Sequence, residues 1–370
     1  NPYSFLHVSR SEIDLDIQTN PYADVVYRKA AENLEALRQS VPLVVEEAPS
    51  LYFYRLQDGS HQQTGLAGCY SIDEYERGVI KRHERTRADK EDDRTRHIVA
   101  VRAQTGIAFL TYRAPEEIAA LQARACEDEP LFDITAPDGV RHTVWRLTNP
   151  DQEAVVRALA EVKTLYIADG HHRIASAARV RGELDAANNH DPIAEACYFL
   201  GVAFPDTETR ILPYNRTVAS LAGMTSANFL ATVKSRFPVM PGVQPVPPKG
   251  EIGMYLAGQW HSVNLDAANL PTGSDVVASL DVTRLQNQIL APLLEVVDVR
   301  TDPRMVFVGG IKGTGELERL VDSGSAAVAF SLAAVTTEEL LAVSDADAIM
   351  PPKSTWFEPK LRDGLLIHML

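Results

Sequence analysis

The chain has 370 residues, 45% of them hydrophobic and 23% charged, which is ordinary for a soluble globular protein long enough for two domains. Its formal net charge of −14 argues against broad electrostatic binding to nucleic acid or to an anionic membrane. Because no run approaches the roughly 18 apolar residues of a membrane span and no signal peptide is evident, we expect a cytoplasmic protein without nucleic-acid or membrane partners.

Three cysteines, Cys69, Cys126 and Cys197, lie far apart in the sequence and lack the spacing of metal ligands. We expect them to be reduced and mostly buried thiols. The chain begins at Asn1 inside a recognisable motif, so we also expect that part of the natural N-terminus is missing.

Residues 1–220 predict an α+β region. Residues 1–20 are predicted to be extended, and an apolar stripe predicts a helix over 22–40. Turn residues and alternating apolar residues predict the elements that follow. These are a strand over 43–56, a turn at 58–59, a strand over 66–70, a helix over 71–80, strands over 97–102 and 107–112, a helix over 115–127, a hairpin around 137–139, a helix over 151–162, and strands over 196–204 and 211–214.

Residues 221–370 predict a second, αβ region that is rich in proline between positions 238 and 248. Its predicted elements are helices over 281–297 and 337–343, strands over 305–308 and 326–331, a helix from 316, and a closing strand over 364–370. The glycine-rich run 309–315 fits neither the P-loop spacing nor the dinucleotide fingerprint, so we interpret it as a structural turn.

The chemistry of the chain is concentrated in residues 164–180, TLYIADGHHRIASAARV. A buried strand is predicted to end at Asp169, Gly170 permits a tight turn, and small residues predict a closely packed helix. The start of such a helix attracts anions, and Arg173 adds a two-pronged anion clamp. His171 and His172 can donate hydrogen bonds or transfer protons near neutral pH.

A purely structural interpretation of this stretch is that Asp169 caps the helix and that His171 and His172 are surface polar residues. Metal binding by these two histidines alone is not expected, because neighbouring side chains point in different directions.

Two further segments carry candidate site residues. The charged run 81–97, KRHERTRADKEDDRTRH, is by composition a solvated loop or helix, and it contains Glu84 and Arg85. Near the other end of the sequence, Lys353, Ser354 and Thr355 follow two prolines at a bend. The lysine can bind a phosphate through its charge, and the two hydroxyl groups can bind it through hydrogen bonds. A surface turn explains this second pattern equally well.

The string ADGHHRIASAA resembles the Gly-His-Arg box of the ParB/sulfiredoxin superfamily, whose members hold nucleotide phosphates with a strand, a turn and a helix. The whole chain resembles more closely a bacterial and archaeal family catalogued as domain of unknown function 1015. This resemblance rests on NPYSFLHVSRSEID, GVIKRHERTRADKEDDR, LPYNR and MPPKSTWFEPK. It implies an α/β fold with a ParB/sulfiredoxin-like mixed-sheet core, elaborated by the C-terminal αβ region.

The more distant resemblance, to the free-serine kinases of that superfamily, implies a phosphotransferase that uses ATP or ADP with Mg²⁺. The substrate would be a small hydroxyl compound such as serine. The His83-Glu84 pair is similar to the His-Glu pair of those kinases at a longer spacing, so Glu84 would orient or deprotonate the hydroxyl. Asp169 would bind Mg²⁺, and His172 is a further catalytic candidate. The candidate phosphate-binding residues are Gly170, His171, His172, Arg173, Arg85, Lys353, Ser354 and Thr355.

We expect Lys353, Ser354 and Thr355 to share one pocket with His171 and Arg173. The reason is charge, because Arg173 and two largely neutral histidines do not balance a polyphosphate beside acidic residues. A phosphatase, a non-enzymatic nucleotide-binding regulator of the ParB type, and an interaction protein with a degenerate site remain alternatives. A homo-oligomer is also compatible with the sequence.

Overall fold

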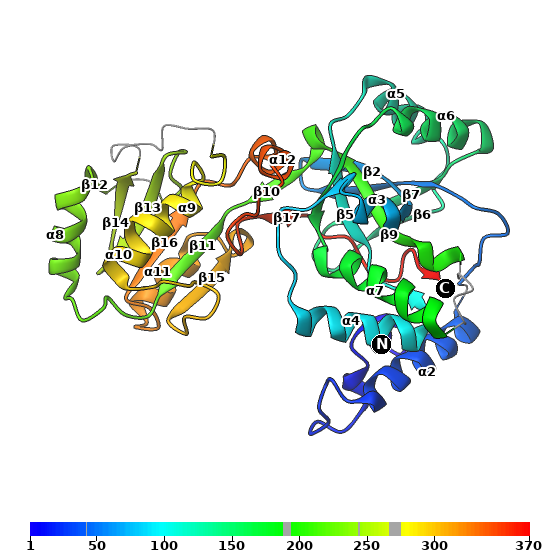
Figure 1. Ribbon diagram of the computed structural model, residues 1–370, viewed down its shortest axis with the longest axis horizontal. Helices are drawn as coiled ribbons and strands as arrows, with labels where there is room; N and C mark the ends of the chain where they lie inside the picture. The colour runs from blue at the N-terminus through cyan, green and yellow to red at the C-terminus, as the bar shows by residue number, and fades with distance from the viewer. Residues whose placement is uncertain (42, 188–193, 243–244, 266–274) are drawn as a thin grey trace. The chain divides into compact units, whose positions relative to one another are not determined.

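The computed structural model describes residues 1–41, 43–187, 194–242, 245–265 and 275–370 (Figure 1). The chain forms two compact units. Unit 1 comprises Asn1–Thr209 and Pro359–Leu370, and unit 2 comprises Arg210–Glu358. The sequence predicted a boundary between residues 220 and 221. In the structure the first segment of unit 1 ends at Thr209, and residues 359–370 return to unit 1.

Unit 1 is built on a mixed sheet of eight strands, which confirms the predicted α/β class. The pairs β3/β8 and β5/β9 are parallel, and the other neighbours are antiparallel. In spatial order the strands are β3 (Ile80–Lys81), β8 (Leu165–Asp169), β5 (Ala108–Tyr112), β9 (Tyr198–Pro205), β2 (His61–Ser71), β1 (Tyr52–Asp58), β7 (Arg141–Arg146) and β6 (Phe132–Thr135).

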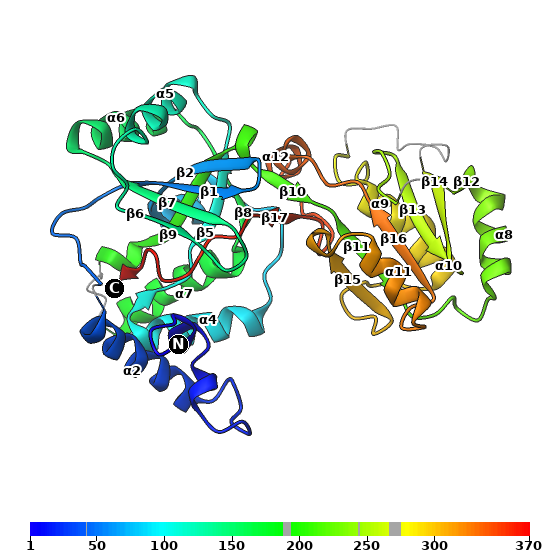
Figure 2. The same ribbon diagram turned by 180° about the vertical axis from the view of Figure 1, so that it is seen from behind.

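Helix α7 (His171–Ala187) packs on this sheet, and further helices of unit 1 pack outside it (Figures 1 and 2). Helix α7 places Ile174 and Ala177 in the core against Leu110 and Ile167, and its small residues permit this close packing. Helix α4 (Ala88–Val101) packs beside α7 and also contacts α2 (Asp24–Ser40). The remaining elements are α1 (Leu6–Ser9), a 3₁₀ helix (Ser11–Asp14), α3 (Ile72–Glu76), α5 (Glu116–Ala125), α6 (Asn149–Ala160), 3₁₀ helices Ala194–Cys197 and Asp206–Glu208, and the paired strands β4 (Ala103–Gln104) and β18 (His368–Met369).

Unit 2 contains an antiparallel sheet of six strands. Their order is β12 (Val239–Pro241), β14 (Gln259–Asn264), β13 (Glu251–Leu256), β16 (Val328–Leu332), β11 (Tyr214–Val218) and β15 (Met305–Gly309). A separate pair joins β10 (Arg210–Leu212) to β17 (Trp356–Glu358). Its helices are α8 (Ser226–Arg236), α9 (Asp281–Leu285), a π-helical turn (Gln286–Leu290), α10 (Ala291–Leu294), a 3₁₀ turn (Gly310–Lys312), α11 (Gly315–Asp322) and α12 (Thr337–Asp345).

Several local predictions were wrong. Residues 97–102 are not a strand, because they lie mainly in α4, where Ile98 and Val101 are three positions apart and share the buried face. Residues 1–20 contain a helix and a 3₁₀ helix rather than extended chain, and the strand expected over 43–56 begins only at Tyr52. The closing strand is limited to β18. The cysteines are free, but Cys69 is exposed and the other two are half-buried.

Within the described residues, no helix combines the length and apolar character needed to cross a membrane.

Candidate functional site

The predicted strand, turn and helix at residues 164–180 are confirmed. Strand β8 ends at Asp169, Gly170 follows with φ +93°, and α7 begins at His171. The backbone N–H of Gly170 donates to Asp169 Oδ1 at 2.7 Å. A Cβ atom at Gly170 would lie 3.3 Å from the Ala108 Cα, and the positive φ disfavours any other residue. The turn therefore requires glycine for both its conformation and its contact with β5.

Asp169 has a cationic partner that the sequence analysis did not assign to the site. Lys360 Nζ donates to Asp169 Oδ2 at 2.7 Å, and both side chains are about half exposed. Burial acts to raise the pKa of Asp169, but Lys360 and Arg173 outweigh it and hold the pKa below its usual value. Asp169 is therefore a carboxylate at neutral pH.

Arg173 lies against the neighbouring loop rather than extending into solvent. Its Nη1 donates to the carbonyl of Ile107, and its Nη2 is 3.6 Å from Asp363 Oδ1. Gly106 leaves room for the guanidinium, because a Cβ there would approach Arg173 Nε to 3.0 Å. The loop thus fixes the direction of this cation next to the turn.

Arg94, on α4, adds a third cation to this region. Burial lowers the pKa of Arg94, and the positive charge of Arg173 lowers it further, while Asp363 and Asp169 oppose these effects. We call Arg94, Arg173 and Lys360 the cationic cluster. Sequence reasoning named only Arg173, although Lys360 stands at the end of the quoted MPPKSTWFEPK motif and Arg94 at the end of GVIKRHERTRADKEDDR.

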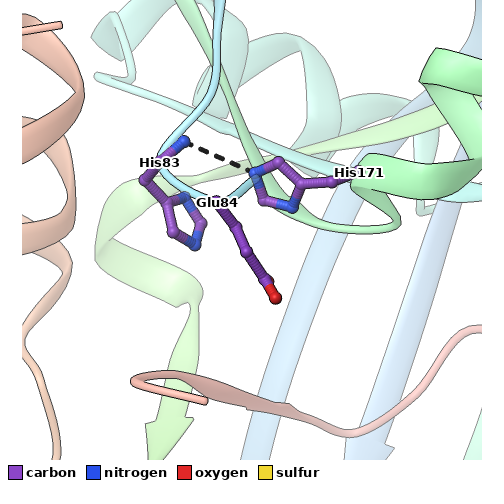
Figure 3. Close-up of side chains that lie close together, drawn as sticks. All are labelled: His83, Glu84 and His171. Carbon is purple, nitrogen blue, oxygen red and sulfur yellow. Dashed lines mark hydrogen bonds between the residues drawn. The ribbon is translucent and has the colours of Figure 1, made fainter. Parts of the chain in front are cut away.

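A second group of side chains collects at the same edge of the sheet. Strands β3 and β8 are parallel neighbours, so the segments that follow them leave the sheet at the same edge. His83 stands two residues after β3 and His171 two residues after β8. The backbone N–H of His83 donates to His171 Nε2 at 3.4 Å, and the ring centroids are 4.6 Å apart (Figure 3).

Glu84 completes this group. One potential ligand atom from each of His83, Glu84 and His171 lies within 4.8 Å of the other two, and Figure 3 shows the three side chains together. Both histidines are buried, and Glu84 is half-buried. We call these residues the His–Glu–His cluster. Sequence reasoning had brought Glu84 and His171 into one site, but it gave His83 no role of its own.

Both buried imidazoles are neutral at pH 7. Burial lowers the pKa of His83 to about 4, against the opposing effects of Asp169 and a backbone hydrogen bond with Ile167. Burial also lowers the pKa of His171 well below its usual value, and the neighbouring His83, His172 and Arg82 reinforce the shift. Positive charge at this edge therefore comes from arginine and lysine, not from these two histidines.

The other predicted site residues have different surroundings. His172 Nε2 accepts a hydrogen bond from the backbone N–H of Arg87 at 3.0 Å, so it faces the start of α4 while His171 faces His83. This divergence agrees with the expectation that adjacent histidines do not converge on one ion. Arg85 is exposed.

Lys353, Ser354 and Thr355 belong to unit 2, whereas the turn belongs to unit 1, so their common pocket stays a prediction. Lys353 has φ +58°, and its Nζ lies 5.5 Å from the ring centroid of Tyr214. Ser354 Oγ donates to the carbonyl of Pro351 at 2.6 Å. The fully buried Arg216 supports the same bend, since its Nη2 donates to the Lys353 carbonyl at 3.2 Å.

Solved structures to which the chain is similar include a free serine kinase mutant in complex with AMP, at 11% identity and TM-score 0.40 over 79% of this chain and 87% of the other. SbnI with a C-terminal truncation, from Staphylococcus aureus, has 12% identity and TM-score 0.40 over 80% of this chain and 84% of the other. A conserved hypothetical protein from Pyrococcus furiosus has 12% identity and TM-score 0.38 over 87% of this chain and 96% of the other. Among curated proteins, none matches the chain. The family model described as "Protein of unknown function (DUF1015)" matches residues 1–283, and the chain belongs to that family.

Proposed function

We propose that this protein transfers a phosphoryl group between a nucleotide, ATP or ADP, and the hydroxyl group of a small metabolite such as serine. The observation that carries the proposal is the cationic cluster beside the glycine turn at the start of α7. A helix of 17 residues presents the positive end of its dipole there, and Arg173 and Lys360 add two fixed charges. Phosphoryl transfer depends mainly on such positioning and charge stabilisation.

In this proposal the turn holds the phosphates. Gly170 allows the backbone to approach them closely, and Arg173 donates paired hydrogen bonds. Lys360 neutralises Asp169 in the absence of a ligand, and it can contribute to phosphate binding because its side chain is about half exposed. The remaining phosphate-binding candidates are His171, His172 and Arg85 in unit 1 and Lys353, Ser354 and Thr355 in unit 2.

The residues present are compatible with the proposed Mg²⁺. Two ionised carboxylate oxygens offer about four lone-pair sites, and the known partners of Asp169 are Gly170 and Lys360. Mg²⁺ is commonly held by one or two carboxylates together with substrate phosphates and water. Asp169 would hold the ion with the nucleotide, and the bound ion would neutralise phosphate charge.

Glu84 is the proposed residue that orients or deprotonates the acceptor hydroxyl, with His172 as a second catalytic candidate. A carboxylate suits this role because it accepts a proton without forming a covalent intermediate. Glu84→Gln preserves the shape but removes the proton acceptor. We therefore expect turnover to fall roughly 10²-fold or more while nucleotide affinity stays close to that of the wild type.

The test of the function is turnover of a panel of nucleotides with serine and other hydroxyl compounds as acceptors, with phosphorylated product identified by mass spectrometry. Release of inorganic phosphate without a phosphorylated acceptor would indicate a phosphatase instead. Nucleotide binding without turnover of any panel member would favour a regulator.

Arg173→Ala tests whether the turn binds the nucleotide. Calorimetry should show weaker binding of ADP, with the thermal midpoint close to that of the wild type. Arg179→Ala is the matched control, because Arg179 lies on the same helix and pairs with Asp92 at 3.3 Å, away from the turn. Equal ADP affinity in all three proteins would remove the turn from the nucleotide site.

A further inference from the structure

We propose that His83, Glu84 and His171 bind one divalent transition-metal ion, such as Zn²⁺, Mn²⁺, Fe²⁺ or Co²⁺. This ion would be distinct from the Mg²⁺ proposed at Asp169. The inference does not rest on phosphoryl transfer, because it follows from the ligand set and its surroundings alone.

The first observation is the convergence of three suitable donors. Their ligand atoms lie within 4.8 Å of one another (Figure 3). Metal–ligand bonds of about 2.0–2.2 Å require donors somewhat closer together than this, so the side chains must contract by roughly 1 Å around the ion. Glu84 can supply most of that movement, because its side chain is long, flexible and only half-buried.

The second observation is a buried nitrogen atom of His83 that lacks a partner. The residue is 2% exposed, and its Nδ1 has no hydrogen-bond partner among the described residues. Leaving a buried polar atom without a hydrogen-bond partner is unfavourable, and such atoms are rare in folded proteins. A metal ion coordinated at Nδ1 would account for this atom.

His171 offers the second imidazole. Its Nε2 accepts from the His83 backbone N–H at 3.4 Å, which is longer than the usual 2.9–3.0 Å for such a bond. An ion bound at the His171 Nδ1 would leave this hydrogen bond in place, whereas an ion bound at Nε2 would displace it.

The chemistry of the donors indicates the class of metal. Two imidazoles and one carboxylate suit Zn²⁺, Fe²⁺, Mn²⁺ or Co²⁺, whereas Mg²⁺ and Ca²⁺ prefer sites made of oxygen. Three protein ligands leave at least one coordination position for water or for a hydroxyl group of a substrate, as in catalytic zinc sites. The inference therefore assigns Glu84 as a metal ligand, a role that would replace that of the base given to it in the proposed function.

The experiment is a titration of metal-free protein with Co²⁺ in the absence of nucleotide, followed by visible absorption, with calorimetric titration of Zn²⁺ in parallel. We expect one high-affinity ion per chain in the wild type. Glu84→Gln and His171→Ala should each weaken binding by at least about 10-fold, as the loss of a ligand demands. Circular dichroism establishes that each variant is folded.

His7→Gln is the matched control. His7 lies 2.8 Å from Asp14, so it offers a histidine and a carboxylate but belongs to no group of three donors among the described residues. Its metal affinity should equal that of the wild type. If His171→Ala does not fold, Glu84→Gln decides the outcome, because its side chain is only half-buried.

Absence of a bound ion in the wild type, or unchanged affinity in folded Glu84→Gln, would overturn the inference. Either result leaves the proposed function intact if ADP still binds in the presence of Mg²⁺ and Arg173→Ala still weakens that binding. Conversely, a metal site without nucleotide binding would refute the proposed function and support the inference.

Discussion

Replacement of Lys360 by methionine separates a nucleotide-binding role from a structural one. Methionine keeps an unbranched side chain but removes the ammonium group that donates to Asp169 Oδ2 at 2.7 Å. Both partners are about half exposed, and exposed ion pairs contribute about 0–1 kcal/mol to the free energy of unfolding. We therefore expect the thermal midpoint of Lys360→Met to change little.

The effect of Lys360→Met on ligand binding should be larger than its effect on stability. A hydrogen bond between a charged donor and a phosphate contributes about 1.5–3 kcal/mol, which corresponds to roughly a 10- to 100-fold change in Kd. Loss of the lysine also removes a charge that holds the pKa of Asp169 below its usual value, so this pKa should rise in the free protein. Both effects arise from the same cation.

The assay is calorimetric titration of ADP at low ionic strength, together with thermal unfolding. Lys29→Met is the control, because Lys29 forms a comparable surface pair with Glu32 at 3.3 Å, on a helix outside the cationic cluster. We expect a weaker Kd in Lys360→Met alone. An unchanged Kd combined with a lower thermal midpoint would refute the reasoning and make Lys360 a structural residue.

Three further predictions test the turn, the composite site and the pH dependence of unit 1. Gly170→Ala should lower the free energy of unfolding by about 1–3 kcal/mol, measured by urea denaturation, because φ is +93° and Ala108 is close. Lys353→Met should weaken ADP binding by calorimetry if the composite pocket forms, and an equal Kd would exclude it. Burial, and secondarily Arg362, lowers the pKa of His142 from 6.5 to about 4, so the folded state favours the neutral ring. This contribution to the free energy of unfolding is fully present above about pH 6.5 and is lost as the pH falls towards 4. Denaturation at several pH values should show a smaller loss of stability at low pH in His142→Gln than in the wild type.

Local sequence patterns were sufficient to predict the turn at the centre of the site. A short apolar run followed by Asp169, Gly170 and a helical pattern of small residues specifies a strand, a turn and a helix without long-range information. The same reasoning failed at 97–102, because a short apolar run fits a strand and a buried helix face equally well. Burial of Ile98 and Val101 against neighbouring elements decided in favour of the helix.

Long-range contacts account for what sequence reasoning missed. His83 meets His171 because β3 pairs in parallel with β8, and two-residue strands such as β3 leave almost no periodic signal. Lys360 reaches Asp169 across 191 positions of sequence. The expectation that Arg173 needs a second fixed cation was based on charge alone. Unit 1 contains Lys360, which pairs with Asp169, while the contribution of Lys353 stays a prediction.

The return of residues 359–370 to unit 1 has a consequence for biosynthesis. The ribosome makes Asp169 and Gly170 early, but it makes the whole of unit 2 before Lys360, Asp363 and strand β18. Until those residues emerge, Asp169 and Arg173 lack the ion-pair partners Lys360 and Asp363 that they have in the finished fold. A nascent chain that stalls within unit 2 therefore lacks both ion pairs, and these contacts form only after both units have been synthesised.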